Sequence, residues 1–200
     1  PVIVIDSQVY RDDLVAMTIV SDNYKAGVLC AKEMMKQKKH ANIVLLTHQA
    51  AKSAVDRING FLDTIKGNKN YKILASADTQ GQIERSLPKV DKIIEEYSNI
   101  DVVMALNDPA AMGALAALDS KDARKGVLVY GIDGAPEGKK LIKEGMMTGT
   151  AAQSPKQMAD TAINAAYQIF DGKKVPKKKV ISVYMITKKN IEQTDISRWQ

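Results

Sequence analysis

The sequence is poor in the residue types from which many catalytic and metal sites are built. It has one cysteine, Cys30, and two histidines, His40 and His48, among 200 residues. A single cysteine excludes an internal disulfide and a metal site made of several cysteines. The sequence has no His-Glu-x-x-His or Cys-x-x-Cys pattern and no glycine-rich phosphate-binding loop. These absences argue against an enzyme, and we expect neither a cofactor nor a metal.

Long apolar runs are also missing. The longest, at 102–106 and 127–130, fall far short of the roughly 20 apolar residues that a membrane-spanning helix needs. The net charge is +6, and much of the lysine excess lies at 173–180 and 187–190. No nucleic-acid-reading motif or interleaved aromatic residue accompanies these lysines, so we expect a solvated loop and strand edge and no nucleic-acid partner.

What the sequence does contain is an alternation of short β-rich runs with amphipathic helical segments. The expected strands lie at 1–6, 15–20, 41–48, 71–78, 101–107, 126–133, 147–153 and 178–187. The expected helices lie at 23–37, 52–67, 82–98, 109–119, 136–144 and 155–171. Parallel strands need crossover connections, so this order predicts an α/β fold with a doubly wound parallel sheet. Cys30 shares a helical face with apolar residues and is expected in the core.

Polar side chains stand where the expected strands end, and ligands of such sheets bind at those ends. The candidate binding residues are Asp6, Arg57, Asn107, Asp133 and Gln153. Carboxylates, amides and a guanidinium together suit a ligand with many hydroxyl groups, because a hydroxyl both donates and accepts. Any one of these positions alone could instead serve as a cap or turn former. We expect Asp108 to cap the helix that Pro109 begins, which would leave the Asn107 amide free for a ligand.

Six segments of the chain, taken in order, resemble one protein family. They are IDSQ (5–8), VSDNYKAGVLCAKEM (20–34), AVDRINGF (54–61), MALNDPAAMGAL (104–115), YGIDGAPEGKKLIKEG (130–145) and TAAQSPKQMA (150–159). Together they cover nearly the whole chain and resemble type I periplasmic binding proteins, particularly the ribose-binding-like subunits of sugar ABC transporters. The resemblance implies that Asp6, Arg57, Asn107, Asp133 and Gln153 contact a monosaccharide or similar polyol.

The resemblance also implies a setting for the protein. It would be an extracytoplasmic solute-binding protein, in the periplasm or as a cell-surface lipoprotein, that delivers its ligand to an ABC transporter permease. Any membrane attachment would come from a lipid anchor on residues that precede this chain. Recognition between two lobes that close on the ligand requires no chemistry, so the expectation of a protein that is not an enzyme stands.

The family pattern divides the chain into four parts. Residues 1–20 would be a remnant of the N-terminal lobe, and residues 21–153 the C-terminal ligand-binding lobe. Residues 154–177 would return to the N-terminal lobe as a helix, and residues 178–200 would form a crossover strand and tail. Because family members open with further βα units, we expect a truncated chain with one complete lobe, which exposes apolar surface and self-associates.

Three alternatives to a transport protein remain open at this point. The effector domain of a LacI-type repressor would need a helix-turn-helix upstream of Pro1. The sensor domain of a membrane receptor would need a membrane-spanning helix after Gln200. An enzyme would need two of Asp6, Asp22 and Asp133 as an acid–base pair, but no His, Ser or Cys stands with them in a known motif.

Overall fold

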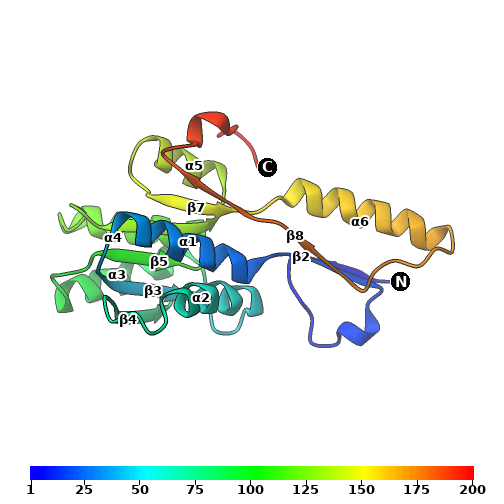
Figure 1. Ribbon diagram of the computed structural model, residues 1–200, viewed down its shortest axis with the longest axis horizontal. Coiled ribbons are helices and arrows are strands. Elements are labelled where there is room, and N and C mark those ends of the chain that lie inside the picture. The colour runs from blue at the N-terminus through cyan, green and yellow to red at the C-terminus, as the bar shows by residue number, and fades with distance from the viewer.

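The computed structural model describes residues 1–200 and contains two separate β-sheets (Figure 1). The larger sheet has the strand order β4-β3-β5-β6-β7-β9. Its strands are β3 (Ala41–Thr47), β4 (Tyr71–Asp78), β5 (Val102–Ala105), β6 (Leu128–Asp133), β7 (Gly149–Ala152) and β9 (Tyr184–Thr187). All neighbours are parallel except β7 and β9, which are antiparallel.

Helices cover both faces of the larger sheet, which confirms the predicted doubly wound fold. Helices α1 (Asn23–Gln37) and α2 (Lys52–Ile65) pack on one face in a core of 17 buried residues that includes Cys30, as expected. Helices α3 (Ile83–Glu96), α4 (Asp108–Ser120) and α5 (Pro136–Lys143) flank the other face, whose core has 18. We call residues 22–153 and 183–200 the large unit.

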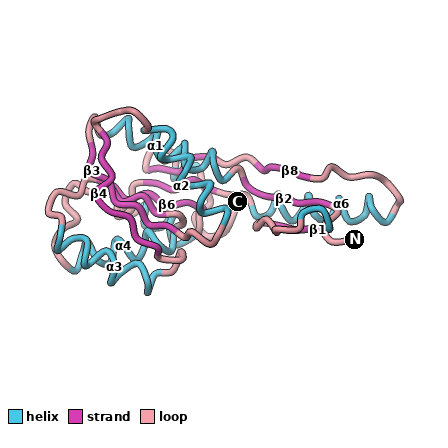
Figure 2. The backbone as a smooth tube through the Cα atoms, turned by 90° about the horizontal axis from the view of Figure 1, so that it is seen from below, coloured by secondary structure: helices cyan, strands magenta, loops and turns pink.

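The smaller sheet consists of β1 (Ile3–Ile5), β2 (Met17–Ser21) and β8 (Lys178–Ile181), in the parallel order β1-β2-β8. Helix α6 (Pro155–Phe170) lies along this sheet, apart from the larger one (Figure 2). The core between them has only six buried residues. We call residues 1–21 and 154–182 the small unit. The lysine-rich edge predicted from the sequence is confirmed, because β8 is an edge strand with Lys178 and Lys179 exposed.

The prediction of one strand at 178–187 is wrong. The segment divides at Ser182 and Val183 into β8, which pairs with β2 of the small unit, and β9, which pairs with β7 of the large unit. The chain therefore passes between the units three times, after Ser21, after Gln153 and after Ser182. A β-rich pattern without an interrupting Gly or Pro gives no sign of such a change of sheet.

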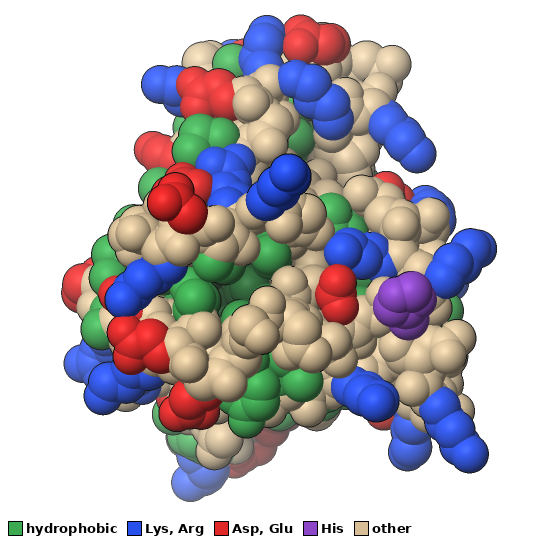
Figure 3. Space-filling model, turned by 90° about the vertical axis from the view of Figure 1, so that its left-hand side faces the viewer, with side chains coloured by type: hydrophobic (Ala, Val, Ile, Leu, Met, Phe, Trp, Pro, Cys, Tyr) green, Lys and Arg blue, Asp and Glu red, His purple; other side chains and the backbone are tan.

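No helix in the structure combines the length and the apolar character that crossing a membrane would require. The end of the large unit that faces away from the small unit carries Lys and Arg side chains interspersed with Asp and Glu, around a hollow with hydrophobic side chains (Figure 3). The basic residues are therefore mixed with acidic ones on this face and do not form a field of one sign.

Candidate functional site

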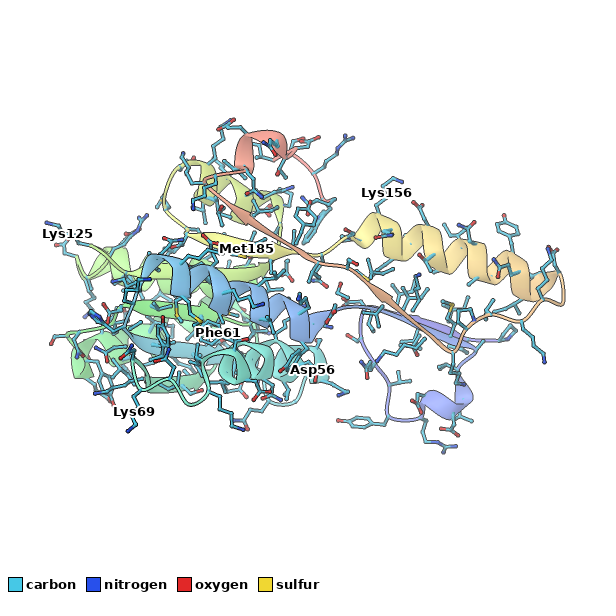
Figure 4. The ribbon with its side chains drawn as sticks, in the orientation of Figure 1. Asp56, Phe61, Lys69, Lys125, Lys156 and Met185 are labelled. Atoms are coloured by element: carbon cyan, nitrogen blue, oxygen red, sulfur yellow. The ribbon has the colours of Figure 1, made fainter.

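A cleft of about 490 Å³ lies at the carboxyl ends of the strands of the larger sheet, where the two units meet. Residues of both units line it, and all five candidates from the sequence are among them: Asp6, Arg57, Asn107, Asp133 and Gln153. Asp56, the neighbour of Arg57 on α2, and Lys156 at the start of α6 lie on the two sides of this junction (Figure 4). The strand-end rule thus brought together residues that are up to 147 positions apart, from 6 to 153.

Arg57 occupies the centre of the cleft wall and is almost completely buried. Its Nε donates to Asn23 Oδ1 at 2.8 Å, and its Nη1 donates to the carbonyl oxygen of Leu106 at 2.9 Å. These contacts depend on the close approach of α1 and α2, because a Cβ on Gly27 would lie 1.8 Å from the Arg57 carbonyl oxygen. The side chain is therefore fixed in position before any ligand arrives, and its Nη2 makes no hydrogen bond to the protein.

Asp133 and Gln153 extend this network to the crossings between the units. Asp133 Oδ1 accepts from Gln153 Nε2 at 2.8 Å and lies 3.4 Å from Arg57 Nη1. Gln153 Oε1 accepts in turn from Ser21 Oγ at 2.7 Å. Burial raises the pKa of Asp133, and the Arg57 guanidinium opposes this shift. One chain of polar contacts therefore joins the first two crossings to the cleft.

The two carboxylates of the cleft share an unusual backbone conformation. Asp6 has φ 71° and Asp133 has φ 145°, in a region that residues with a side chain rarely adopt. Backbone strain of this kind gathers at binding sites, where the surrounding structure holds it in place. Asp6 comes from the small unit and is exposed, and its carboxylate makes no hydrogen bond to the protein. It is therefore free to meet a ligand held by the large unit.

The prediction that Asp108 caps the helix and leaves the Asn107 amide free is wrong. Asn107 is the N-cap of α4, since its Oδ1 accepts from the Ala110 amide at 3.0 Å, and its Nδ2 donates to the Gly81 carbonyl oxygen at 3.1 Å. Asn107 lines the cleft but its amide is already engaged on both sides. The physical reason is simple, because Asn and Asp are equally good caps and the sequence alone does not separate them.

Asp108 is instead completely buried inside the large unit. Its carboxylate accepts from Thr150 Oγ1 at 2.6 Å and from the Ala135 amide at 2.9 Å. Gly131 and Gly138 make room for it, since a Cβ on either would lie within 2.6 Å of a carboxylate oxygen. Burial and the nearby Asp133 carboxylate raise the pKa of Asp108 to about 7. Asp108 thus holds the turn between β6 and α5 that carries Asp133.

The cleft is equipped for recognition of hydroxyl groups. Arg57 Nη2, Asp133 Oδ2 and both oxygens of Asp6 make no hydrogen bond to the protein, so they offer one fixed donor group beside carboxylate acceptors. Vicinal hydroxyls match such an arrangement, because each can donate a hydrogen bond to a carboxylate and accept one from the guanidinium.

Sequence reasoning missed several residues of the site. Ser21 and Asn23 were not among the candidates, although they hold Gln153 and Arg57. Trp199 was not singled out, yet it lines the cleft. The only signal available for it was its position as the single tryptophan, in a short polar tail after the last strand.

Comparison with known proteins gives consistent matches. The family described as periplasmic binding protein domain matches residues 1–174. The ribose import binding protein of Salmonella typhimurium is 30% identical over 190 residues, covering 94% of this chain and 63% of that protein. The D-apiose import binding protein of Paraburkholderia graminis is 26% identical over 200 residues, covering 98% and 64%. An ABC transporter solute-binding protein of Actinobacillus succinogenes, solved with bound D-allose, superposes with a TM-score of 0.92 at 25% identity, covering 97% of this chain and 72% of that one.

Proposed function

The chain belongs to the periplasmic binding protein domain family, and from this premise we propose that it binds a monosaccharide or similar polyol as part of a sugar ABC transporter's solute-binding protein. The resemblance to ribose-binding-like type I proteins is confirmed at the level of family and fold. Because the chain spans 63% of the length of the ribose import relative, its ligand, partner and location are proposals about the whole protein.

The observation that carries the proposal is the Arg57–Asp133 pair. Both side chains are largely buried, and hydrogen bonds to Asn23, Leu106 and Gln153 fix them in place. A ligand that lacks the matching hydroxyl would leave a buried group unpaired, and this penalty would make the cleft selective. Asp6 approaches the same cleft from the small unit, so one ligand could contact both units at once.

Recognition by both units suggests how binding would be signalled. In the proposed mechanism the large unit is the C-terminal lobe and the small unit is part of the N-terminal lobe. The lobes close around the three crossings when a ligand bridges Asp6 and Arg57. The closed form would present the surface that a permease reads. No catalytic step is proposed, because the cleft offers recognition groups and no activated nucleophile.

The same premise supports an extracytoplasmic location, in the periplasm or at the cell surface through a lipid anchor on residues outside this chain. Self-association through exposed apolar surface of the small unit is a further proposal. The repressor effector domain and the receptor sensor domain are not favoured, because the relatives compared above are named as import binding proteins.

The proposal is tested by thermal unfolding of the chain in D-ribose, D-allose and D-apiose up to about 100 mM, since a ligand of the folded state raises the midpoint even when it binds weakly. Because concentrated sugars stabilise most proteins by exclusion from their surface, each curve is compared with that of Asp133→Asn. A midpoint shift that Asp133→Asn loses and that the exposed control Asp160→Asn retains supports the proposal. Equal shifts in all three proteins, with every sugar, would refute it.

A further inference from the structure

The last seven residues, 194–200, return to the cleft and form what we call the C-terminal tail. After the 3-10 helix η2 (Ile191–Gln193), the chain crosses α5, and its end lies between β7 and the start of α6 (Figure 1). Ile191 is buried in the core of the large unit, and Ile196 packs against that core. The tail is therefore anchored at its beginning to the large unit and ends at the junction of the two units.

Lys139 of α5 holds the tail by two hydrogen bonds. Its side chain is completely buried, and its ammonium donates to the carbonyl oxygens of Asp195 at 2.6 Å and Arg198 at 2.5 Å. Burial lowers the pKa of Lys139, while the Asp195 carboxylate opposes that shift. A buried lysine is costly unless its donors are satisfied, and here two backbone carbonyls of the tail satisfy two of its three N–H donors. The tail conformation and the burial of Lys139 thus depend on each other.

Gln200 packs behind the turn that carries Asp133. Its Oε1 lies 2.8 Å from the position that a Cβ on Gly134 would take, and both atoms of its side-chain amide are buried. With Lys139 holding residues 195 and 198 on one side and Gln200 docked on the other, the position of Trp199 between them is fixed by the backbone. The contacts made by the residues before and after Trp199 therefore place its indole at the cleft.

Trp199 is the only Phe, Trp or Tyr among the 16 residues that line the cleft, and it is 47% exposed. The protein already buries about half of this side chain. A ligand in the cleft would bury more of the apolar indole surface, and this burial would favour binding. The faces of a sugar ring carry C–H groups that pack on an aromatic face, while its edges carry the hydroxyls that Arg57 and Asp133 can bind.

We infer that the C-terminal tail is a clamp that presents the Trp199 indole as an apolar wall of the cleft, where it packs against the C–H face of a bound monosaccharide. This inference rests on the proposed function and adds a binding residue and its positioning residue, Lys139. It predicts a preference for pyranose or furanose rings over open-chain polyols such as sorbitol, which present no extended C–H face.

The test uses the fact that Trp199 is the only tryptophan, so that indole fluorescence reports on this position alone. In the unchanged chain, D-ribose or D-allose is expected to shift the emission to shorter wavelength and to protect the indole from acrylamide. Trp199→Ala should weaken sugar binding, measured by calorimetry, about tenfold, whereas Trp199→Phe keeps a ring and should stay within about threefold. An unchanged affinity in Trp199→Ala would overturn the inference, as would an emission spectrum that saturating sugar leaves unaltered.

The clamp itself is tested without any sugar. Lys139→Met should release the tail, so that acrylamide quenches Trp199 more strongly and its emission moves to longer wavelength, while the exposed neighbour Lys140→Met should leave both unchanged. Equal quenching in the two variants would overturn the clamp. If the thermal unfolding test above shows no specific sugar binding to the unchanged chain, the proposed function fails and the stacking role fails with it. If sugar binds but Trp199 does not respond, only the further inference fails.

Discussion

The two units are built from the same parallel βα elements but differ in how much they bury. The large unit covers both faces of its sheet with helices and has cores of 18 and 17 buried residues. The small unit has one α-helix, α6, which exposes Ile163, Tyr167 and Phe170, and a core of six residues. Since burial of apolar surface drives folding, most of the stability resides in the large unit. The large unit is therefore the more stable side of the cleft and the small unit the less stable one.

The chain offers a direct way to sharpen this comparison, because it has two phenylalanines and each unit has one. Phe61 is completely buried between α2 and the larger sheet, whereas Phe170 at the end of α6 is 79% exposed. Phe61→Ala should lower the free energy of unfolding by about 3–5 kcal/mol, because it leaves a cavity. Phe170→Ala should change it by less than about 0.5 kcal/mol. Urea denaturation measures both, and similar losses would mean that the units do not differ as described.

The polar network of the large unit should be nearly as sensitive as its core. Arg57→Met keeps the aliphatic stem but leaves Asp133 buried without its ion pair, so we expect a loss of about 3 kcal/mol in unfolding free energy. The exposed Arg85, which makes no ion pair, is the matched control, and Arg85→Met should have almost no effect. Denaturant unfolding of the two variants decides the matter, and a small loss for Arg57→Met would contradict a rigid, prearranged cleft wall.

The buried Asp108 predicts a pH dependence that originates in the large unit. Its pKa is raised to about 7 in the folded protein, so between about pH 4 and 7 the folded state keeps a proton that the unfolded state has lost. This contribution to stability is complete below about pH 4 and is lost as the pH rises toward 7, at about 1.4 kcal/mol per pH unit. Asp108→Asn cannot titrate, so the gap in unfolding free energy between the two proteins should change steadily with pH. If the unfolding free energies of the two proteins change with pH in the same way, Asp108 is not the origin of the pH dependence.

The smallest expected effect concerns the exposed surface of the small unit. Replacing Tyr167 and Phe170 together by Ser removes two large apolar side chains from the outer side of α6, and should weaken self-association about tenfold. Tyr10→Ser is the control, since Tyr10 is fully exposed in a loop away from that helix. Sedimentation equilibrium over a range of concentrations compares them, and a monomeric unchanged chain would end the proposal of self-association.

Much of the fold and the cleft could be predicted from the sequence, because the relevant signals are local. The strand and helix periods predicted the doubly wound sheet, and the strand-end rule predicted that Asp6, Asp133 and Gln153 lie in one cleft. The family resemblance added that Arg57 points into it. The misses depend on distant contacts. Asp108 is buried because Gly131 and Gly138 leave space for it, and nothing in the adjacent sequence distinguishes it from Asn107.

The division of 178–187 into two strands could not be predicted for a related reason. The choice of sheet is made by the partners β2 and β7, which lie far away in the sequence. The role of the tail could not be predicted either. In the sequence Lys139 looks like a surface lysine of an amphipathic helix, and only its contacts with residues 195 and 198 show that it holds the tail.

The left-handed backbone at Asp6 and Asp133 limits how the ligand preference of this cleft can be altered by mutation. Only Gly, Asn and Asp adopt positive φ without a large penalty, so the substitutions tolerated at these positions can remove a charge but cannot lengthen the side chain or add a positive charge. New preferences must therefore be sought at neighbouring positions with ordinary backbone, such as His48, Ser53 or Ala159. Redesign of this cleft would begin at those positions and leave Asp6 and Asp133 unchanged.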